Sequence, residues 1–560
     1  MEISSRQAII RPRFLRKRFP RASTRRRPQS RLLYWLFLAA CGTVVALILT
    51  VPLYLIMRMV GSGREAAQLL VKASTLQILN NTILLAAAVT AAAILIALPV
   101  AWLTTRTDLP GRRIWTILSA LPLVLPSYVA AYLFATILAP KGMVQQFLEP
   151  LTGLERMPSL VGFPGAFMVL TFITYPYILL TTRAALQRMD PAMVEAARSL
   201  GSSPWQAFRR VTFPALRPAI IAGSILVTLY VLRDFGAVTM WQYSTFTRVI
   251  YNRYLSYRLD TAAALAFTVV VVTVIILFIE FQARGSMRYD RLSSGAVRPQ
   301  RKVALGHWKW PALFFLGVLI TVTLILPLTG LSVWLWRGLS QDSSILFSSV
   351  ENSSFELFIQ ITAAAWNSLS VSLIAAILLA FIALPISILV VRYPSRLTHL
   401  FERVTHLSYA LPGLVVALAL VFFGIQYTQS LYQSTPMLLA AYLVLFIPQA
   451  VGSQRVAMMQ ISPRLEEAGR SLGKRPWTVF RRITFPLMRP GILAGAALVF
   501  LTCMKELPAT LILSPMGFST LATQIWANIN EAFFARAALP TLLLLLLSSL
   551  PLAVLTLREK

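Results

Sequence analysis

Long apolar segments alternate with short polar segments along almost the whole chain. Runs of about 20 apolar residues have the length that an α-helix needs to cross the roughly 30 Å of hydrocarbon in a bilayer. The pattern therefore predicts one membrane-spanning helix in each of twelve runs. They lie at 33–57, 81–104, 116–139, 160–182, 219–241 and 262–282, and then at 311–336, 367–391, 405–426, 434–454, 491–513 and 537–557.

One polar segment occurs twice. From Glu195 the chain reads EAARSLGSSPWQAFRRVTFPALRP, and 272 residues later, from Glu467, it reads EAGRSLGKRPWTVFRRITFPLMRP, with 16 of 24 positions identical. Such a match indicates an internal duplication. Together with six apolar runs on each side, it predicts an all-α polytopic membrane bundle of two pseudo-symmetric six-helix halves.

The duplication sets the expected domain boundaries. Residues 1–31 form a basic tail, 32–285 the first half with its repeated loop at 190–218, 286–310 a linker, and 311–560 the second half with its repeated loop at 462–490.

Composition and charge support a membrane protein and orient it. The chain is 57% hydrophobic and only 13% charged, which is too apolar for a soluble protein of this length. The net charge of +32 raises the question of nucleic acid as a partner, but 40 of the 52 Lys and Arg residues lie in the N-terminal tail, alternate loops and the C-terminus. By the positive-inside bias, both termini and both repeated loops face the cytoplasm. The tail is then a basic anchor on the lipid bilayer, and no nucleic-acid partner is expected.

Each repeated loop predicts a helix, a break and a second short helix. Asp190 and Ser462 are good N-caps, each followed by a proline, and Gly201 and Gly473 are typical of the position just past a helix end. A second short helix then begins at Pro204 or Pro476. It carries an aromatic pair and two arginines: Trp205, Phe208, Arg209 and Arg210 in the first copy, and Trp477, Phe480, Arg481 and Arg482 in the second.

The aromatic residues at i and i+3 share one helix face. Aromatic anchors beside arginines are typical of a protein-binding hot spot. The alternative is a loop that packs its aromatic side chains at the membrane interface. Two near-identical copies favour two equivalent protein partners.

The repeated segment resembles the EAA loop of binding-protein-dependent ABC importer permeases. In that family the loops dock into clefts on two cytoplasmic ATPase subunits. The resemblance assigns this role to Glu195, Ala196, Ala197, Gly201, Trp205, Arg209 and Arg210, and to Glu467, Ala468, Gly469, Gly473, Trp477, Arg481 and Arg482. Two departures are Gly469 in place of the second alanine, and Phe213 and Phe485 where leucine is usual.

The length, the fusion of two halves and the run from Lys505 to Leu511 are similar to the ferric-iron (Fbp-type) permeases, with Asp234-Phe235-Gly236 as the first-half counterpart. This resemblance implies ferric iron uptake across a bacterial inner membrane, with a periplasmic substrate-binding protein as partner. Fused thiamine and aminophosphonate permeases share the EAA loops, so these substrates remain open.

The residue pattern predicts a transport subunit rather than an enzyme. The chain has no G-x-x-x-x-G-K-[ST] segment, so ATP is expected to bind a partner chain. No cluster of His, Cys or carboxylates has ligand spacing within a span, so neither a resident metal nor a cofactor is expected. An ion-driven secondary transporter, also a duplicated bundle, would need unpaired intramembrane carboxylates. Only Asp234, Glu506 and the terminal Glu280 could serve.

Two charge pairs fall late in the fifth span of each half. Arg233-Asp234 and Lys505-Glu506 align at the 272-residue offset. Charges at such depth usually face a bundle interior or water. We expect them to gate the pathway by bonding across the pseudo-twofold axis, Arg233 to Glu506 and Lys505 to Asp234. The alternative is that the helices end just before these residues and leave the charges solvated, since Gly236 and Pro508 follow.

Prolines recur inside the predicted spans. Pro99 matches Pro385 at an offset of 286, and the third spans carry Pro122 and Pro412, which we take as counterparts. Such prolines kink a helix, either for packing or as a hinge.

Overall fold

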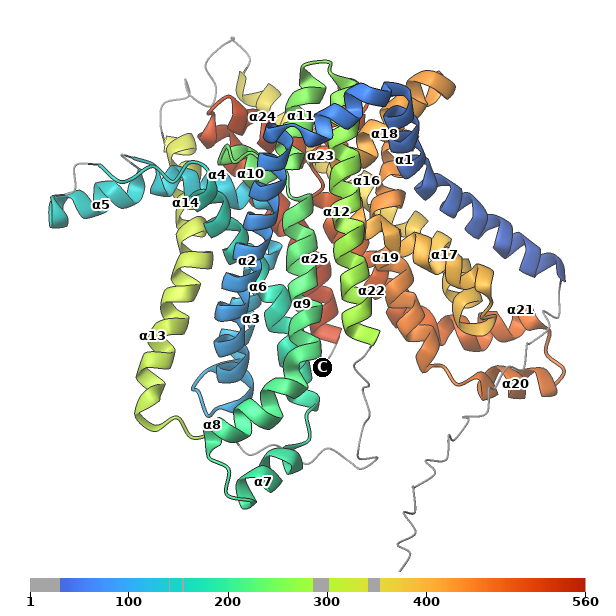
Figure 1. Ribbon diagram of the computed structural model, residues 1–560, viewed down its shortest axis with the longest axis horizontal. Coiled ribbons are helices and arrows are strands. Elements are labelled where there is room, and N and C mark those ends of the chain that lie inside the picture. Colours follow the sequence, from blue (N-terminus) through green and yellow to red (C-terminus); the bar gives the residue numbers. More distant parts are fainter. Residues whose placement is uncertain (1–30, 141, 154–155, 286–301, 341–352, 559–560) are drawn as a thin grey trace, which may run out of the picture.

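The protein is built from helices. The computed structural model describes residues 31–140, 142–153, 156–285, 302–340 and 353–558 (Figure 1). Within these ranges the backbone forms helices and one isolated β-bridge, between Thr107 and Val303, and no strand. The predicted all-α bundle is confirmed. The basic tail, apart from Arg31, and most of the 286–310 linker lie outside the described residues.

The two halves contain corresponding helices, with 3₁₀ and π turns labelled η. The first half has α1 (Arg31–Val71), α2 (Ala73–Arg106), α3 (Arg112–Ala120), η1 (Leu121–Val124), α4 (Ser127–Leu138), α5 (Met143–Thr152), α6 (Phe163–Arg188), α7 (Pro191–Ser199), α8 (Pro204–Ala207), η2 (Phe208–Thr212), α9 (Phe213–Arg233), α10 (Gly236–Met240), α11 (Phe246–Leu255) and α12 (Leu259–Gly285). The second has η3 (Gly306–Trp308), α13 (Lys309–Ile320), η4 (Thr321–Ile325), α14 (Leu326–Ser340), α16 (Ser353–Arg392), α17 (Arg396–Leu407), η5 (Ser408–Ala410), α18 (Gly413–Tyr427), η6 (Gln429–Leu431), α19 (Thr435–Gln460), α20 (Pro463–Ser471), α21 (Pro476–Val479), η7 (Phe480–Thr484), α22 (Phe485–Met504), α23 (Pro508–Leu513), α24 (Leu521–Asn530) and α25 (Phe534–Arg558).

Every predicted apolar run overlaps a helix. Among the described residues, 10 helices are long and apolar enough to cross a membrane, or 11 if the bent pair Arg396–Ala410 and Gly413–Tyr427 counts as one span. The last run corresponds to α25, whose described apolar part, Phe534–Ser549, is shorter. In Figure 1 the long helices stand side by side as one bundle.

The third span of each half is broken, where a continuous helix was expected. In the second half the two pieces meet at 108°. The residue before a proline is driven out of helical geometry, and Leu125 and Leu411 are both extended, with ψ of 123° and 114°. Pro126 and Pro412 then serve as N-caps of α4 and α18. The pairing of Pro122 with Pro412 was therefore wrong, because Pro126 is the counterpart, at the same 286-residue offset that relates Pro99 to Pro385.

The fifth spans end earlier than their apolar runs. The runs 219–241 and 491–513 predicted helices through Asp234 and Glu506, but α9 ends at Arg233 and α22 ends at Met504. After two or three non-helical residues the chain enters the short helices α10 and α23. By contrast, α2 and α16 continue past Pro99 and Pro385 without a break.

The first span of each half bridges the two halves. Helix α1 packs on α12 of its own half and on α16, α17 and α18 of the other, where Tyr54 lies 5.0 Å from Phe422 between ring centroids. Helix α14 packs on α25 of its own half and on α4 of the other. Figure 1 shows α1 and α13 on opposite flanks of the bundle.

The start of α13 is tied to the first half by Asp108. Its carboxylate accepts the backbone N–H of Leu305 at 2.9 Å and lies 2.9 Å from the Lys309 ammonium. These two donors hold the pKa of Asp108 below its ordinary value. The entry to the second half is thereby fixed against the first.

Candidate functional site

Helix α7, the first candidate docking helix, has the ends that the sequence predicts. The Asp190 carboxylate accepts the backbone N–H of Ala192 at 3.0 Å and caps the helix before Pro191. At the other end Gly201 has a φ of 84°, a conformation that glycine adopts at little cost. The N–H of Ser202 then reaches back to the Ala197 carbonyl at 3.1 Å. This closes the helix and turns the chain sharply.

Helix α20, the second candidate docking helix, ends in the same way. Gly473 has a φ of 72°, and the N–H of Lys474 reaches the Gly469 carbonyl at 3.3 Å. Ser462 occupies the N-cap position but makes no side-chain capping bond. The predicted helix and glycine break are confirmed in both copies.

The segment after the break is not the separate short helix that we expected. Helix α8 begins at Pro204 with a Ser203–Gln206 capping box and continues through the π turn η2 directly into α9. The second copy does the same from Pro476 through η7 into α22. The candidate docking surface thus includes the first turns of each fifth span and is continuous with that span.

An exposed aromatic pair lies at each of these turns. Trp205 stacks on Phe208 with 5.5 Å between ring centroids, and Trp477 stacks on Phe480 at the same distance. The two indoles are 69% and 61% exposed. The remaining docking candidates around them are also mostly exposed: Glu195, Ala196, Arg209, Arg210, Glu467, Ala468, Arg481 and Arg482.

Gly469, the departure in the second loop, has a packing explanation. A Cβ there would lie 2.9 Å from Ile483 Cδ1 and 3.2 Å from Val479 Cγ2. In the first loop Ala197 faces the smaller pair Ala207 and Val211 at the corresponding positions. Larger neighbours in one copy are offset by a smaller residue opposite them, as close packing requires.

The carboxylates late in the fifth spans cap the short helices that follow the breaks. Asp234 Oδ2 accepts the N–H groups of Ala237 at 3.0 Å and Val238 at 3.3 Å. Glu506 Oε1 accepts the N–H of Ala509 at 3.2 Å. The N-terminal N–H groups of a helix have no partner within it. One side chain in each half therefore satisfies donors that the break exposes.

The predicted ion pairs across the pseudo-twofold axis are not formed. Among the described residues, no ion pair joins Arg233 to Glu506 or Lys505 to Asp234. Lys505 Nζ instead donates to the Leu123 carbonyl of η1, in the other half, at 3.3 Å. Asp234 Oδ2 instead accepts two backbone N–H groups and Glu506 Oε1 accepts one, so both carboxylates serve the starts of the short helices.

The alternative prediction is also only half right. The helices do end at the charge pairs, but Asp234 is only 6% exposed, and Arg233, Lys505 and Glu506 are half-buried rather than fully solvated. The guanidinium of Arg233 lies near Glu506 and near Tyr409 of η5. Tyr409 is the counterpart of Leu123 at the 286-residue offset. Each cation thus faces the broken third span of the opposite half.

The two capping sites contain side chains of different size, and in each site a larger residue is matched with a smaller one. In the first half the shorter Asp234 interacts with the hydroxyl of Ser127 at the start of α4. In the second the longer Glu506 meets Gly413 at the start of α18, where a Cβ would lie 2.5 Å from Oε1. Ser127 and Gly413 correspond at the 286-residue offset. The extra methylene of glutamate fills the space that serine occupies in the other half.

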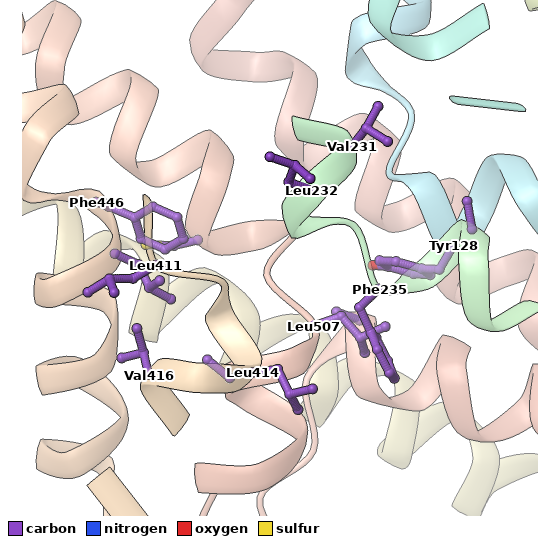
Figure 2. Close-up of a cluster of buried hydrophobic side chains, with 14 of the residues drawn as sticks. Tyr128, Val231, Leu232, Phe235, Leu411, Leu414, Val416, Phe446 and Leu507 are labelled. Carbon is purple, nitrogen blue, oxygen red and sulfur yellow. The ribbon is translucent and has the colours of Figure 1, made fainter. Parts of the chain in front are cut away.

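Apolar side chains next to the charge pairs pack between the two halves. Phe235 and Leu507, which follow the two carboxylates, are each 2% exposed. Phe235 lies 4.8 Å from Tyr251 of α11 and 5.1 Å from Trp526 of α24, between ring centroids. Figure 2 draws Phe235 and Leu507 in one buried cluster with Tyr128. Burial raises the pKa of Tyr251 above its ordinary value.

Sequence reasoning missed these four closing residues. The 272-residue offset would have identified Phe235 and Leu507, which flank the charge pairs. No such signal was available for Tyr251 and Trp526, because their contact with Phe235 depends on how the breaks turn the chain.

Comparison with known proteins finds membrane components of transport systems. Residues 105–286 and 372–559 each match the family described as binding-protein-dependent transport system inner membrane component. The chain is 32% identical over 526 residues to the Fe(3+)-transport system permease protein FbpB 2 of Haemophilus influenzae, covering 93% of this chain and 98% of that protein. It is 24% identical over 466 residues to the ferric transport system permease protein FbpB of Actinobacillus pleuropneumoniae, covering 80% and 66%. A sulfate transport system permease protein, CysT of Salmonella typhimurium, is 30% identical over 184 residues, covering 32% and 65%.

The compensated capping sites predict a reciprocal rescue. Gly413→Ser should destabilise the fold by about 1–3 kcal/mol, because it overpacks a filled site. Adding Glu506→Asp should recover much of this loss, since the pair then has the Asp and Ser of the first half. Thermal unfolding of the purified protein, followed by circular dichroism, measures both. Gly452→Ser is the control, because nothing lies within 4 Å of a Cβ there. A double variant no more stable than Gly413→Ser alone would contradict the compensation.

Proposed function

The chain belongs to the family of binding-protein-dependent transport system inner membrane components, and on this premise we propose that it is the permease of a bacterial ABC importer for ferric iron. The family match implies ATPase and substrate-binding partners. The chain itself is a transport subunit and not an enzyme. ATP hydrolysis in the partner would drive the change of access.

The observation that carries this proposal is the pair of exposed docking helices. In Figure 1, α7 and α8 of the first half and α20 and α21 of the second project from the same end of the bundle. Each pair presents a stacked Trp and Phe beside two arginines. Two such surfaces fit two copies of one ATPase. With the charge distribution, they support a cytoplasmic position for this end and for both termini.

Iron is favoured as the substrate by the extent of the similarity. The Haemophilus influenzae relative, whose name specifies Fe(3+) transport, aligns over almost its whole length. The sulfate relative aligns with a third of the chain. Thiamine and aminophosphonate remain the alternatives from the loop resemblance.

The breaks in the third and fifth spans support a pathway between the halves. Arg233, Asp234, Lys505 and Glu506 all lie at these breaks, where helix ends from both halves meet. Phe235 and Trp526 close the space toward α11 and α24, which lie at the end opposite the docking helices in Figure 1. We therefore place the outward gate at Phe235, Leu507, Tyr251 and Trp526. The burial of Phe235 and Leu507, each 2% exposed, fits a closed gate.

Reconstitution tests the substrate. The chain, its ATPase and its binding protein are placed in liposomes, and the binding protein is loaded with radioactive ferric ion. We expect uptake of iron that requires both ATP and the binding protein, and no uptake of sulfate or thiamine. ATP-dependent transport of either solute without transport of iron would refute the ferric assignment.

The docking surfaces predict a specific effect of removing the indoles. Trp205→Ala and Trp477→Ala should each weaken ATPase binding by about 2 kcal/mol or more, because central aromatic anchors dominate such interfaces. Copurification of the ATPase and the rate of uptake should both fall. Trp310→Ala is the matched control, since this indole is 77% exposed but lies at the start of α13. Unchanged ATPase binding in both docking variants would exclude these surfaces.

The fused halves predict the stoichiometry. One copy of this chain carries both docking loops, so it should bind two ATPase subunits without a second permease. Native mass spectrometry of the purified complex measures the ratio. Two copies of this chain per ATPase pair would contradict the proposal.

A further inference from the structure

The second docking helix is fastened to the bundle by a buried ion pair. Arg392 ends α16, and its Nε and Nη2 each donate to Glu466 Oε1 of α20 at 3.1 Å. Nη2 also donates to the Ile461 carbonyl at 3.0 Å, and Thr484 of η7 donates to the same carboxylate at 3.2 Å. The two charged side chains are only 8% and 6% exposed. The Glu466 carboxylate therefore joins α20 to the end of α16 and to η7, and Arg392 also bonds the end of α19.

The first docking helix lacks this fastening. Arg106 ends α2 at the position that corresponds to Arg392, and it is also buried, at 8% exposed. Its Nη2 donates to the Leu186 carbonyl at 3.1 Å, but its Nε has no hydrogen-bond partner. Val194 stands where the second half has Glu466. The arginine is retained, and the carboxylate that would join it to α7 is absent.

A second arginine shows the same difference. Arg455 of α19 pairs with Glu402 of α17, which is 9% exposed. The corresponding residues of the first half are Arg183 and Thr116. The first half thus lacks the corresponding buried carboxylate at both places, with Val194 in place of Glu466 and Thr116 in place of Glu402.

We propose that Glu466 is a positioning residue that makes the second docking helix a rigid extension of α16, whereas the first docking helix is held more loosely. The inference rests on the proposed docking role. A buried charged pair that is also hydrogen-bonded resists separation, because each charge would be left without a partner. Movement of the second ATPase subunit would thus reach α16 directly, while α7 can shift relative to α2.

Matched spin labels test the difference in mobility. Leu200 and Leu472 correspond in the two loops and are 87% and 78% exposed, and both native cysteines are buried. The label is attached to Leu200→Cys or Leu472→Cys in the full chain in lipid nanodiscs, and its mobility is read from the electron paramagnetic resonance spectrum. We expect the label at 472 to be the less mobile. Equal mobility at the two sites would overturn the inference.

Two substitutions should each reduce the expected difference in label mobility between positions 200 and 472. Glu466→Gln should raise the mobility at 472 to that at 200, and Val194→Glu should lower the mobility at 200 by giving Arg106 a carboxylate. Glu402→Gln is the control, because it breaks a buried pair that does not involve α20. If Glu402→Gln raised the label mobility at 472 as much as Glu466→Gln does, the effect would be general destabilisation. A specific role for Glu466 would then be refuted.

The complex with the ATPase distinguishes this inference from the docking proposal. Glu466→Gln should leave ATPase copurification intact but increase the ATP hydrolysed per ion transported. Val194→Glu should retain binding as well. If the ATPase did not bind the wild-type loops at all, the docking proposal would fail while the label mobilities still reported on the ion pair. An unchanged ATP-to-ion ratio in Glu466→Gln would refute its positioning role in coupling.

Discussion

Within a bilayer, a helix that breaks must find partners for its free N–H groups inside the protein, because no bulk water is there to supply them. The breaks after α9 and α22 meet this requirement with one carboxylate each. Asp234 and Glu506 accept the N–H groups at the starts of α10 and α23. The same contacts provide partners for two charges that would otherwise be costly at this depth. Phe235 and Leu507 lie in the non-helical residues of these breaks, and the change of chain direction there lets them pack between the halves.

The two halves have diverged in matched sets of residues rather than singly. Asp234 with Ser127 corresponds to Glu506 with Gly413, and each set fills its site. Ala197 with small neighbours likewise corresponds to Gly469 with larger ones. The arginines that end α2 and α16 are different, since only Arg392 has a carboxylate. The two halves are therefore packed in an equivalent way, but the docking helices α7 and α20 are not attached to the bundle by equivalent bonds.

The apolar pattern and the 272-residue repeat predicted the helix class, the duplicated bundle and the helix ends at Asp190, Gly201 and Gly473. These features depend on residues close together in the chain, such as a cap or a glycine with positive φ. The breaks were less accessible, because the runs through Pro126 and Asp234 remain apolar on both sides of the interruption. The expected pairing of Lys505 with Asp234 failed for a related reason. Opposite charges at equal depth suggested a bond, but the sequence did not reveal that backbone donors would occupy the carboxylate.

Helices α1 and α14 connect the two halves on opposite flanks, since each contacts the last span of its own half and the third span of the other. Moving the halves directly apart would separate α1 and α14 from the apolar surfaces of the opposite half. In a rocking motion these two helices need only slide along those surfaces. The geometry therefore favours rotation of the halves over separation. It also means that packing of α1 and α14 holds the halves together in addition to the covalent connection between them.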